Sequence, residues 1–370
     1  DVCFQIGIQL GSWCAGSRLP RIELCGVRHY FNAPLEILGR YIAAHYKDSI
    51  AVTKVVVTLP LPDAALAPLR EHFQVLAWEH SEPMSSETLA ARLRDADGVL
   101  CTLNSRFDAA LLAANSHLKV ISSVSVGVDH IDLDAATAAG IPVGHTPGVL
   151  VDSTADMALS LMLATTRRIA EADRFIRDGG WTSGWSTGFF LGTDLSRATV
   201  GLVGLGPIGQ AVAKRLQGFG ARVIAWNRSP KDVPGVDMVD LDTLFAESDV
   251  VSIHAALTAD THHLVSAARL ASMKDGAILI NTARGGLVDE GALITELHNG
   301  RLRAGLDVFE QEPLSPESPL LGLDNVVLVP HLGSATAATR QAMVRLALGN
   351  LIAGMTGQPL PHCANSGVYS

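Results

Sequence analysis

Three short segments in the second half of the chain carry side chains that could together reduce a keto group. They are INTARGG with Arg284, GLDVFEQEP with Asp307 and Glu312, and VPHLGSAT with His331. Hydride addition to a ketone develops negative charge on the oxygen, so the reaction needs a proton donor and a fixed cation nearby. A histidine beside a carboxylate favours imidazolium and can supply the proton, and arginine has the planar fork that matches a carboxylate. These residue types are suited to the reduction of a carbonyl group.

A glycine-rich turn earlier in the chain is typical of dinucleotide binding. VGLGPIGQ follows the apolar run ATVGLV and opens an amphipathic helix, which is the context that the Gly-x-Gly-x-x-Gly pattern requires. Gly204 permits the tight turn, Gly206 lets a pyrophosphate approach the backbone, and Gly209 allows the helix and the strand to pack closely. The phosphates would lie at the helix N-terminus, where free N–H groups meet them.

The residues after the next strand favour NADPH over NADH. An acid normally holds the ribose of NAD there, but this chain carries Asn227, Arg228 and Ser229. An acid would repel a ribose 2′-phosphate, whereas Arg228 can pair with it and its two neighbours can donate hydrogen bonds. The alternative interpretation is that Arg228 is an ordinary surface arginine on a solvated loop.

Two alternating series of elements would position these residues. From Val55 to IPVGH (141–145), β-branched runs alternate with helix-like segments, and a second such series runs from ATVGLVG to NVVLVPH. This alternation predicts parallel sheets with helices on both faces. We therefore expect an α/β protein with two doubly wound parallel-sheet domains, a flavodoxin-like substrate domain and a Rossmann cofactor domain. Because ligands bind at the carboxyl ends of such strands, the three segments should converge there.

The expected domain boundaries follow from the two series. They are residues 1–51 for an N-terminal extension outside the fold, 52–151 for the substrate-binding domain, 152–333 for the NADP-binding Rossmann domain, and 334–370 for a C-terminal helix that returns to the substrate-binding domain. Residues 152–178 should form one long helix between the domains, capped by Asp152 or Ser153 and stopped by Gly179.

Composition narrows the function further. The chain has 370 residues, 48% of them hydrophobic. Its net charge of −9 and the lack of a run rich in lysine and arginine argue against nucleic acid or an anionic membrane surface as a partner. No apolar run is long enough to span a bilayer, and no secretory signal is evident, so we expect a cytoplasmic protein. None of the five cysteines forms a Cys-x-x-Cys pair. We expect no metal site, and His262 and His263 are interpreted as surface histidines.

From Val55 to about Val368 the chain resembles the D-isomer-specific 2-hydroxyacid dehydrogenase family. The segment LDVFEQEPLSPESPLL…NVVLVPHLGSATAATR looks especially like bacterial glyoxylate/hydroxypyruvate reductases, some of which also reduce 2-ketogluconate. The resemblance implies that Arg284 clamps the substrate carboxylate and polarises the keto oxygen, that His331 donates the proton, and that Glu312 orients His331. It also implies that the backbone N–H groups of Val126 and Gly127 help to hold the carboxylate.

Further contacts are expected on the same basis. Leu103 should line the substrate pocket beside Val126, and the remaining cofactor contacts should come from Pro207, Ile208, His254, Ala255, Thr282, Ala283, Asp307 and Gly333. Many relatives carry His-x-Pro where this chain has His254, Ala255 and Ala256.

The leading hypothesis is an NADPH-preferring reductase of small 2-keto acids such as glyoxylate and hydroxypyruvate, acting as a homodimer. A 2-ketogluconate reductase of the same family is one alternative, because loops around Leu103 and Val126 set the pocket depth. A dinucleotide-sensing interaction protein that resembles a corepressor is another. Some relatives insert an aromatic residue into the partner subunit's substrate site, and Trp185, Phe189 and Phe190 are the candidates here, with core packing as the competing interpretation.

Overall fold

The computed structural model describes residues 22–24, 27–29 and 53–370. The chain divides into two units, residues 1–52 and residues 53–370. In the first unit, β1 (Ile22–Leu24) pairs antiparallel with β2 (Val27–His29). The expectation that residues 1–51 form an extension otherwise falls on positions outside the described residues.

The smaller sheet of the second unit has five parallel strands in the order β4-β3-β5-β6-β7. They are β3 (Lys54–Val57), β4 (Gln74–Ala77), β5 (Gly98–Cys101), β6 (Val120–Ser123) and β7 (Val143–Gly144). One face is covered by α3 (Ser86–Leu93), α4 (Ala109–Ala114) and α5 (Leu133–Ala138), and the other by α2 (Asp63–Arg70) and α12 (Ala337–Met355). The middle strands β5 and β6 are buried throughout, as parallel strands covered on both faces must be.

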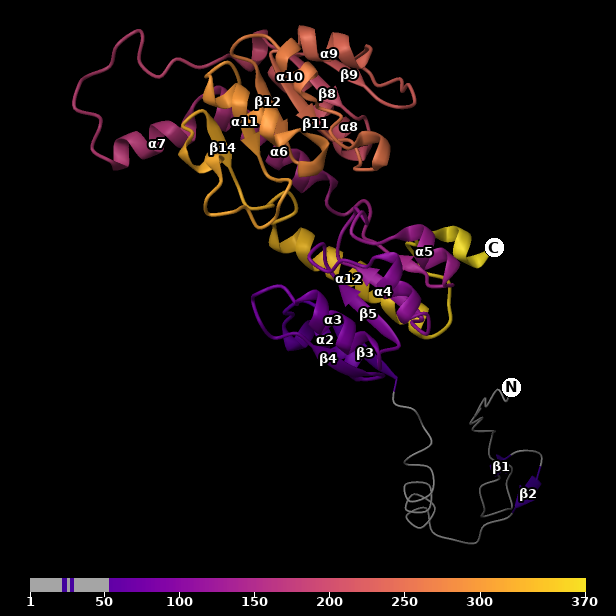
Figure 1. Cartoon of the computed structure of the whole chain (residues 1–370). Helices are drawn as coiled ribbons and strands as arrows, with labels where there is room; N and C mark the ends of the chain where they lie inside the picture. Colours follow the sequence, from indigo (N-terminus) through magenta and orange to yellow (C-terminus); the bar gives the residue numbers. More distant parts are fainter. Residues whose placement is uncertain (1–21, 25–26, 30–52) are drawn as a thin grey trace, which may run out of the picture. The chain divides into compact units, whose positions relative to one another are not determined.

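The larger sheet has seven parallel strands in the order β10-β9-β8-β11-β12-β13-β14. They are β8 (Thr199–Val203), β9 (Arg222–Trp226), β10 (Asp237–Met238), β11 (Val250–Ile253), β12 (Ile278–Asn281), β13 (Arg303–Leu306) and β14 (Val326–Leu328). One face carries α6 (Val151–Thr166) and α8 (Pro207–Phe219), and the other carries α9 (Leu241–Glu247), α10 (Ala267–Ser272) and α11 (Glu290–His298). Figure 1 shows these helices against the sheet.

The expected fold class is confirmed, because both sheets are parallel and doubly wound. The larger sheet has the strand order of a Rossmann domain and the smaller one that of a flavodoxin-like domain. Short 3₁₀ turns occupy Leu195–Arg197, Ala259–Thr261, Gly285–Leu287, Pro319–Gly322 and Ser366–Tyr369. Within the described residues, no helix is long and apolar enough to cross a membrane.

The single helix expected over residues 152–178 is wrong, because two helices occupy this stretch. α6 ends at Thr166 and α7 (Ile169–Arg177) begins after Arg168, whose φ of +54° is left-handed. The Arg168 guanidinium donates two hydrogen bonds of 2.8 and 2.6 Å to the Glu171 carboxylate one turn later. The N-cap of α6 is Leu150, without a side-chain hydrogen bond, so the predicted N-caps Asp152 and Ser153 are also wrong. The predicted stop is confirmed, because α7 ends with Asp178 as its C-cap and Gly179 follows with a φ of +74°. Neither glycine nor proline marks the break, which explains why the sequence pattern did not reveal it.

Candidate active site

Three neighbouring strands of the larger sheet bring the candidate catalytic segments to one edge. In the register of β11, β12, β13 and β14, Ile253 lies beside Asn281, Asn281 beside Leu306, and Leu306 beside Leu328. The three segments predicted to carry chemistry follow the last three of these strands. They therefore leave the sheet side by side at its carboxyl edge, where doubly wound folds bind their ligands.

The histidine and the glutamate form a direct pair. His331 Nδ1 lies 2.7 Å from Glu312 Oε2, and the two side chains are 30% and 33% exposed. The Phe309 N–H donates to the other carboxylate oxygen of Glu312 at 3.1 Å, which fixes its orientation. Burial alone would raise the pKa of Glu312, but the bonded and charged His331, with Phe309 and Arg284, lowers it below its ordinary value. The pair leaves Nε2 of His331 without a hydrogen bond to any described residue.

The loop that presents the histidine is held by a buried acid. Asp307 is 1% exposed, and its carboxylate oxygens accept hydrogen bonds from the N–H groups of Leu332 and Gly333. Burial raises the pKa of this carboxyl group above its ordinary value, against the effect of its hydrogen bonds. His331 itself has a φ of +52°, a left-handed conformation that is unusual for a residue other than glycine. The surrounding hydrogen bonds stabilise this conformation.

Arg284 lies in a turn that is pinned from both sides. The Asn281 side chain donates to the Arg284 carbonyl at 2.9 Å and accepts from the Ala283 N–H at 3.0 Å. The Arg284 guanidinium donates from Nη1 to the Ala283 carbonyl at 2.7 Å. From Nε it donates to both carboxylate oxygens of Asp129, at 2.9 and 3.2 Å. This ion pair joins the loop after β12 to the loop after β6 of the smaller sheet.

The predicted substrate-binding residues follow strands of that smaller sheet. Leu103 comes two residues after β5, and Val126 and Gly127 come after β6; all three are partly buried. The Val126 carbonyl lies 3.1 Å from Nδ1 of His145. Gly127 lies directly against Arg284, because a Cβ added at this position would be 2.1 Å from Nη2. The structure therefore brings Gly127 and Arg284 together.

The glycine turn after β8 has the shape that a dinucleotide needs. Gly204 has a φ of +102°, and a Cβ there would lie 2.8 Å from the backbone of His254. A Cβ at Gly209 would lie 2.1 Å from the Gly204 carbonyl oxygen, whereas Gly206 faces open space. Gly206 is the N-cap of α8 and Pro207 follows it, so no side chain caps the first N–H groups of this helix. These features fit a pyrophosphate group.

Buried polar atoms beside this turn support the same fit. His254 bonds through Nε2 to the Ser252 hydroxyl at 2.9 Å, and burial lowers its pKa to about 4, so its ring is neutral at neutral pH. Neither Nδ1 of His254 nor Oγ1 of Thr282 has a hydrogen-bond partner among the described residues, although both atoms are buried. Ala255 and Ala283 adjoin them in the chain and are partly buried. Buried polar groups without partners are rare and favour an external ligand.

The loop predicted to contact the ribose lies over the glycine turn. Asn227 accepts from the Leu205 N–H at 2.9 Å and donates to the Ser229 carbonyl at 2.7 Å. Arg228 and Ser229 are exposed. Lys231, which the sequence analysis did not single out, donates to the Leu205 carbonyl at 2.9 Å. Its signal in the sequence is a second cation three residues after Arg228.

The aromatic segment after α7 separates the three candidate residues. Phe189 and Phe190 pack against Phe175 with ring centroids 5.8 and 5.3 Å away, and edge-to-face against each other at 4.8 Å. Trp185 is 82% exposed. Of the three, Trp185 is therefore the side chain that the described residues leave uncovered.

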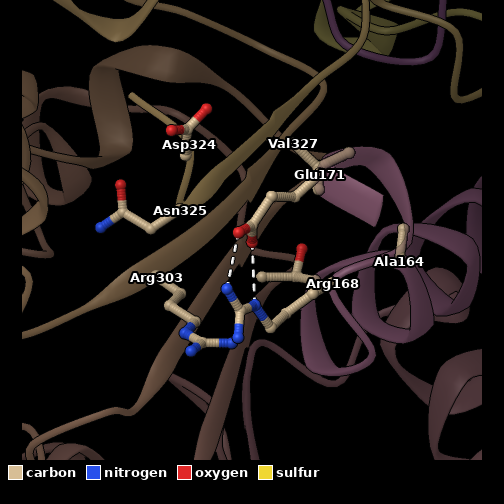
Figure 2. A pocket seen from close by; sticks show the side chains of 8 residues that line it. Ala164, Arg168, Glu171, Arg303, Asp324, Asn325 and Val327 are labelled. Carbon is tan, nitrogen blue, oxygen red and sulfur yellow. Dashed lines mark hydrogen bonds and ion pairs between the residues drawn. The ribbon is translucent and has the colours of Figure 1, made fainter. Parts of the chain in front are cut away.

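A cavity of about 140 Å³ lies away from this site. It is lined by residues of the α6–α7 junction, such as Arg168 and Glu171, and by Arg303 and Asn325 near the starts of β13 and β14. Figure 2 shows the Arg168–Glu171 pair with the Arg303 side chain beside it. The candidate catalytic residues follow the ends of the strands, so this cavity is not their site. Among the described residues, no group of His, Cys, Asp and Glu is suited to hold a metal ion.

Comparison with known proteins places this geometry in context. Residues 159–333 match the family model for the NAD-binding domain of D-isomer specific 2-hydroxyacid dehydrogenases. The chain is 47% identical over 326 residues to a glyoxylate reductase of Thermofilum pendens, covering 86% of this chain and 96% of the relative. It is 44% identical over 317 residues to the glyoxylate reductase/hydroxypyruvate reductase of Mus musculus, covering 83% and 96%. The crystal structure of an NADPH-dependent glyoxylate/hydroxypyruvate reductase from Sinorhizobium meliloti, solved with NADP and malonate, superposes with a TM-score of 0.75 at 34% identity, covering 84% and 96%.

Proposed function

The chain belongs to the D-isomer-specific 2-hydroxyacid dehydrogenase family, and we propose that it reduces glyoxylate and hydroxypyruvate to their 2-hydroxy acids with NADPH. The observation that carries the proposal is the His331–Glu312 pair at 2.7 Å, which lies at the same sheet edge as the turn of Arg284. A proton donor and a fixed cation are the two groups that carbonyl reduction requires of the protein.

Each side chain has a distinct role in this proposal. Arg284 binds the substrate carboxylate and polarises the keto oxygen, with help from the backbone N–H groups of Val126 and Gly127. When bound, the nicotinamide supplies the hydride. His331 donates the proton from Nε2, since Glu312 holds Nδ1 and thereby orients the ring. Residues 52–151 would bind the substrate and residues 152–333 the cofactor.

The preference for NADPH rests on Arg228. No acid stands at positions 227–229, where it would hold the ribose of NAD, and Arg228 is exposed beside the glycine turn. Lys231 adds a second positive charge to the same loop. Two cations, with no acid at positions 227–229, favour a 2′-phosphate over a 2′-hydroxyl group.

We also propose that the protein is a homodimer that pairs through α7 and the segment after it. α7 has no buried residue and exposes Ile169 and Ile176 by 54% and 57%. The following segment exposes Trp181 by 59% and Trp185 by 82%, and Figure 1 shows it projecting from the larger sheet with α7. Four large exposed apolar side chains on one helix and the segment after it support a surface that another protein covers.

A single panel of assays tests the activity. Purified protein would be incubated with NADPH or NADH and with glyoxylate, hydroxypyruvate or 2-ketogluconate, and kcat/KM would be measured for each combination. We expect the highest values with NADPH and the two smaller acids. Absence of turnover with every acid would contradict the proposed activity. If 2-ketogluconate were turned over best, it would take the place of glyoxylate and hydroxypyruvate as the proposed substrate.

A further inference from the structure

One side chain that contacts Arg284 has no role in the proposed mechanism. Asp129 accepts from Arg284 Nε at 2.9 and 3.2 Å, across 155 positions of sequence. The two side chains are 28% and 22% exposed, so each side of the ion pair is partly shielded from solvent. It is also the only ion pair of Asp129 with any described residue.

The remaining contacts of Arg284 show what the pair does to the guanidinium. Nη1 donates to the Ala283 carbonyl at 2.7 Å, and Nη2 lies against Gly127, where even a Cβ would come within 2.1 Å. The two hydrogen bonds from Nε to Asp129, the one from Nη1 and the contact of Nη2 with Gly127 leave the guanidinium plane little freedom to rotate. Without Asp129, only the Nη1 bond and the contact with Gly127 remain.

We propose that Asp129 is a positioning residue, which orients the Arg284 guanidinium so that its free N–H groups meet the carboxylate of the keto acid. This inference rests on the proposed role of Arg284. A guanidinium that is held in place before binding loses less rotational freedom when it pairs with a substrate, so the carboxylate binds more tightly.

The charges around the pair support this arrangement. His130, the next residue, is buried, and burial lowers its pKa to about 4. Its ring is therefore neutral at neutral pH and does not compete with Arg284 for the Asp129 carboxylate. The ring bonds instead to the Ser123 hydroxyl at 3.0 Å. The acid on the other side, Glu312, is committed to His331 and Phe309. Among the described residues, the Asp129 carboxylate accepts hydrogen bonds from Arg284 only, although its charge also raises the pKa of the neighbouring His130 against the larger effect of burial.

The geometry makes two substitutions behave differently. Asp129→Asn keeps an oxygen that can accept a hydrogen bond from Nε but removes the negative charge. In the parent, that charge also repels an anionic substrate. Asp129→Ala removes the acceptor and frees the guanidinium. If orientation is the function, Asp129→Ala should raise KM for glyoxylate about tenfold or more, as expected for loss of a charge-assisted hydrogen bond, while Asp129→Asn should stay within about threefold of the parent.

The experiment measures kcat and KM for glyoxylate, KM for NADPH, and the dissociation constant of oxamate, an unreactive mimic of glyoxylate, in the cofactor-loaded protein. The matched control is Asp134→Ala, an exposed acid five residues later with the same change of charge. Asp129→Ser, too short to reach Nε, is measured in parallel in case the alanine variant does not fold. We expect Asp129→Ala and Asp129→Ser to weaken glyoxylate and oxamate binding with KM for NADPH unchanged, and Asp134→Ala to match the parent.

Other outcomes overturn the inference or its premise separately. If Arg284→Met raises KM for glyoxylate but neither Asp129→Ala nor Asp129→Ser does, the positioning role is wrong and the proposed function stands. If all Asp129 variants bind oxamate more tightly, the acid competes with substrate for Arg284 and does not position it. If Arg284→Met leaves glyoxylate binding unchanged, the proposed role of Arg284 is wrong, and the inference about Asp129 loses its premise.

Discussion

Replacing Asn227 by Asp together with Arg228 by Ile should shrink or reverse the proposed preference for NADPH over NADH. The Leu205 N–H donates to Asn227 Oδ1 at 2.9 Å, and an aspartate can accept the same bond, so the loop should keep its contact with the glycine turn. The change gives up the 2.7 Å bond from Asn227 Nδ2 to the Ser229 carbonyl. Because Arg228 is exposed and no described residue pairs with it, its removal leaves no buried partner without a bond.

The size of the effect follows from two contributions. A charge-assisted hydrogen bond at an exposed position lies at the low end of its range, roughly tenfold in affinity. A new carboxylate beside the 2′-phosphate adds repulsion of roughly fivefold in a water-like dielectric. Together the NADPH/NADH ratio of kcat/KM should fall by roughly fiftyfold. Lys231 remains beside the Leu205 carbonyl and should preserve part of the NADPH affinity.

The assay determines KM and kcat for both cofactors at saturating glyoxylate in the parent, in the double variant and in Lys214→Met. Lys214 is an exposed lysine of α8 and controls for the loss of one positive charge on the same domain. We expect kcat to change little, since the adenosine end of the cofactor lies far from the transferred hydride. An unchanged cofactor ratio in the double variant, or a parent that already prefers NADH, would show that Arg228 is only a surface arginine.

Five further outcomes are expected. His331→Ala should lose several orders of magnitude in kcat with nearly normal binding of NADPH, measured by fluorescence titration, and Glu312→Gln should move the alkaline fall of kcat to lower pH. Because the pKa of Glu312 is lowered in the folded protein, its carboxylate stabilises the fold at pH values above its ordinary pKa of 4.5. This stabilisation is lost as the pH falls through the lowered pKa. The difference in Tm between the parent and Glu312→Gln should therefore shrink below pH 4.5. Deletion of residues 1–51 should preserve folding and turnover, and loss of either would refute the extension hypothesis. Ile176→Glu, which places a charge on the exposed face of α7, should convert a dimer into monomers in light scattering, whereas a parent that is already monomeric would refute the pairing.

The fold could be predicted because two sequence periods repeat without interruption. Buried strands such as VVSI and ILIN are continuous apolar or small-residue runs between helical patterns, and parallel sheets require such runs. The two-residue strand Asp237–Met238 escaped detection because an edge strand this short and polar carries no period. The break at Arg168 escaped because it lies at a left-handed arginine and not at a helix-breaking glycine or proline.

The sequence could predict which site residues lie together only for residues that follow strands of the same sheet. Arg284, Glu312 and His331 follow successive parallel strands, and strand order alone brings them to one edge. The Arg284–Asp129 pair depends on how the loops of the smaller sheet meet those of the larger one, which no spacing in the sequence encodes. The only sequence signal was the position of Asp129 at the end of the SVGVD segment, two residues after Gly127.

Asp307 and Glu312 show why the type of a residue does not by itself assign its role. Both are acids in one loop, five residues apart, yet burial raises the pKa of Asp307 while the His331 pair holds that of Glu312 low. The Asp307 carboxylate accepts from two backbone N–H groups of the loop that carries His331, so it fixes the path of the chain. Glu312 fixes the ring itself. The sequence placed Asp307 among the cofactor contacts, but both of its carboxylate oxygens are already bonded, and any contact with a cofactor would have to share them. Asp307→Asn should therefore disturb the orientation of His331, and lower kcat, more than it weakens NADPH binding.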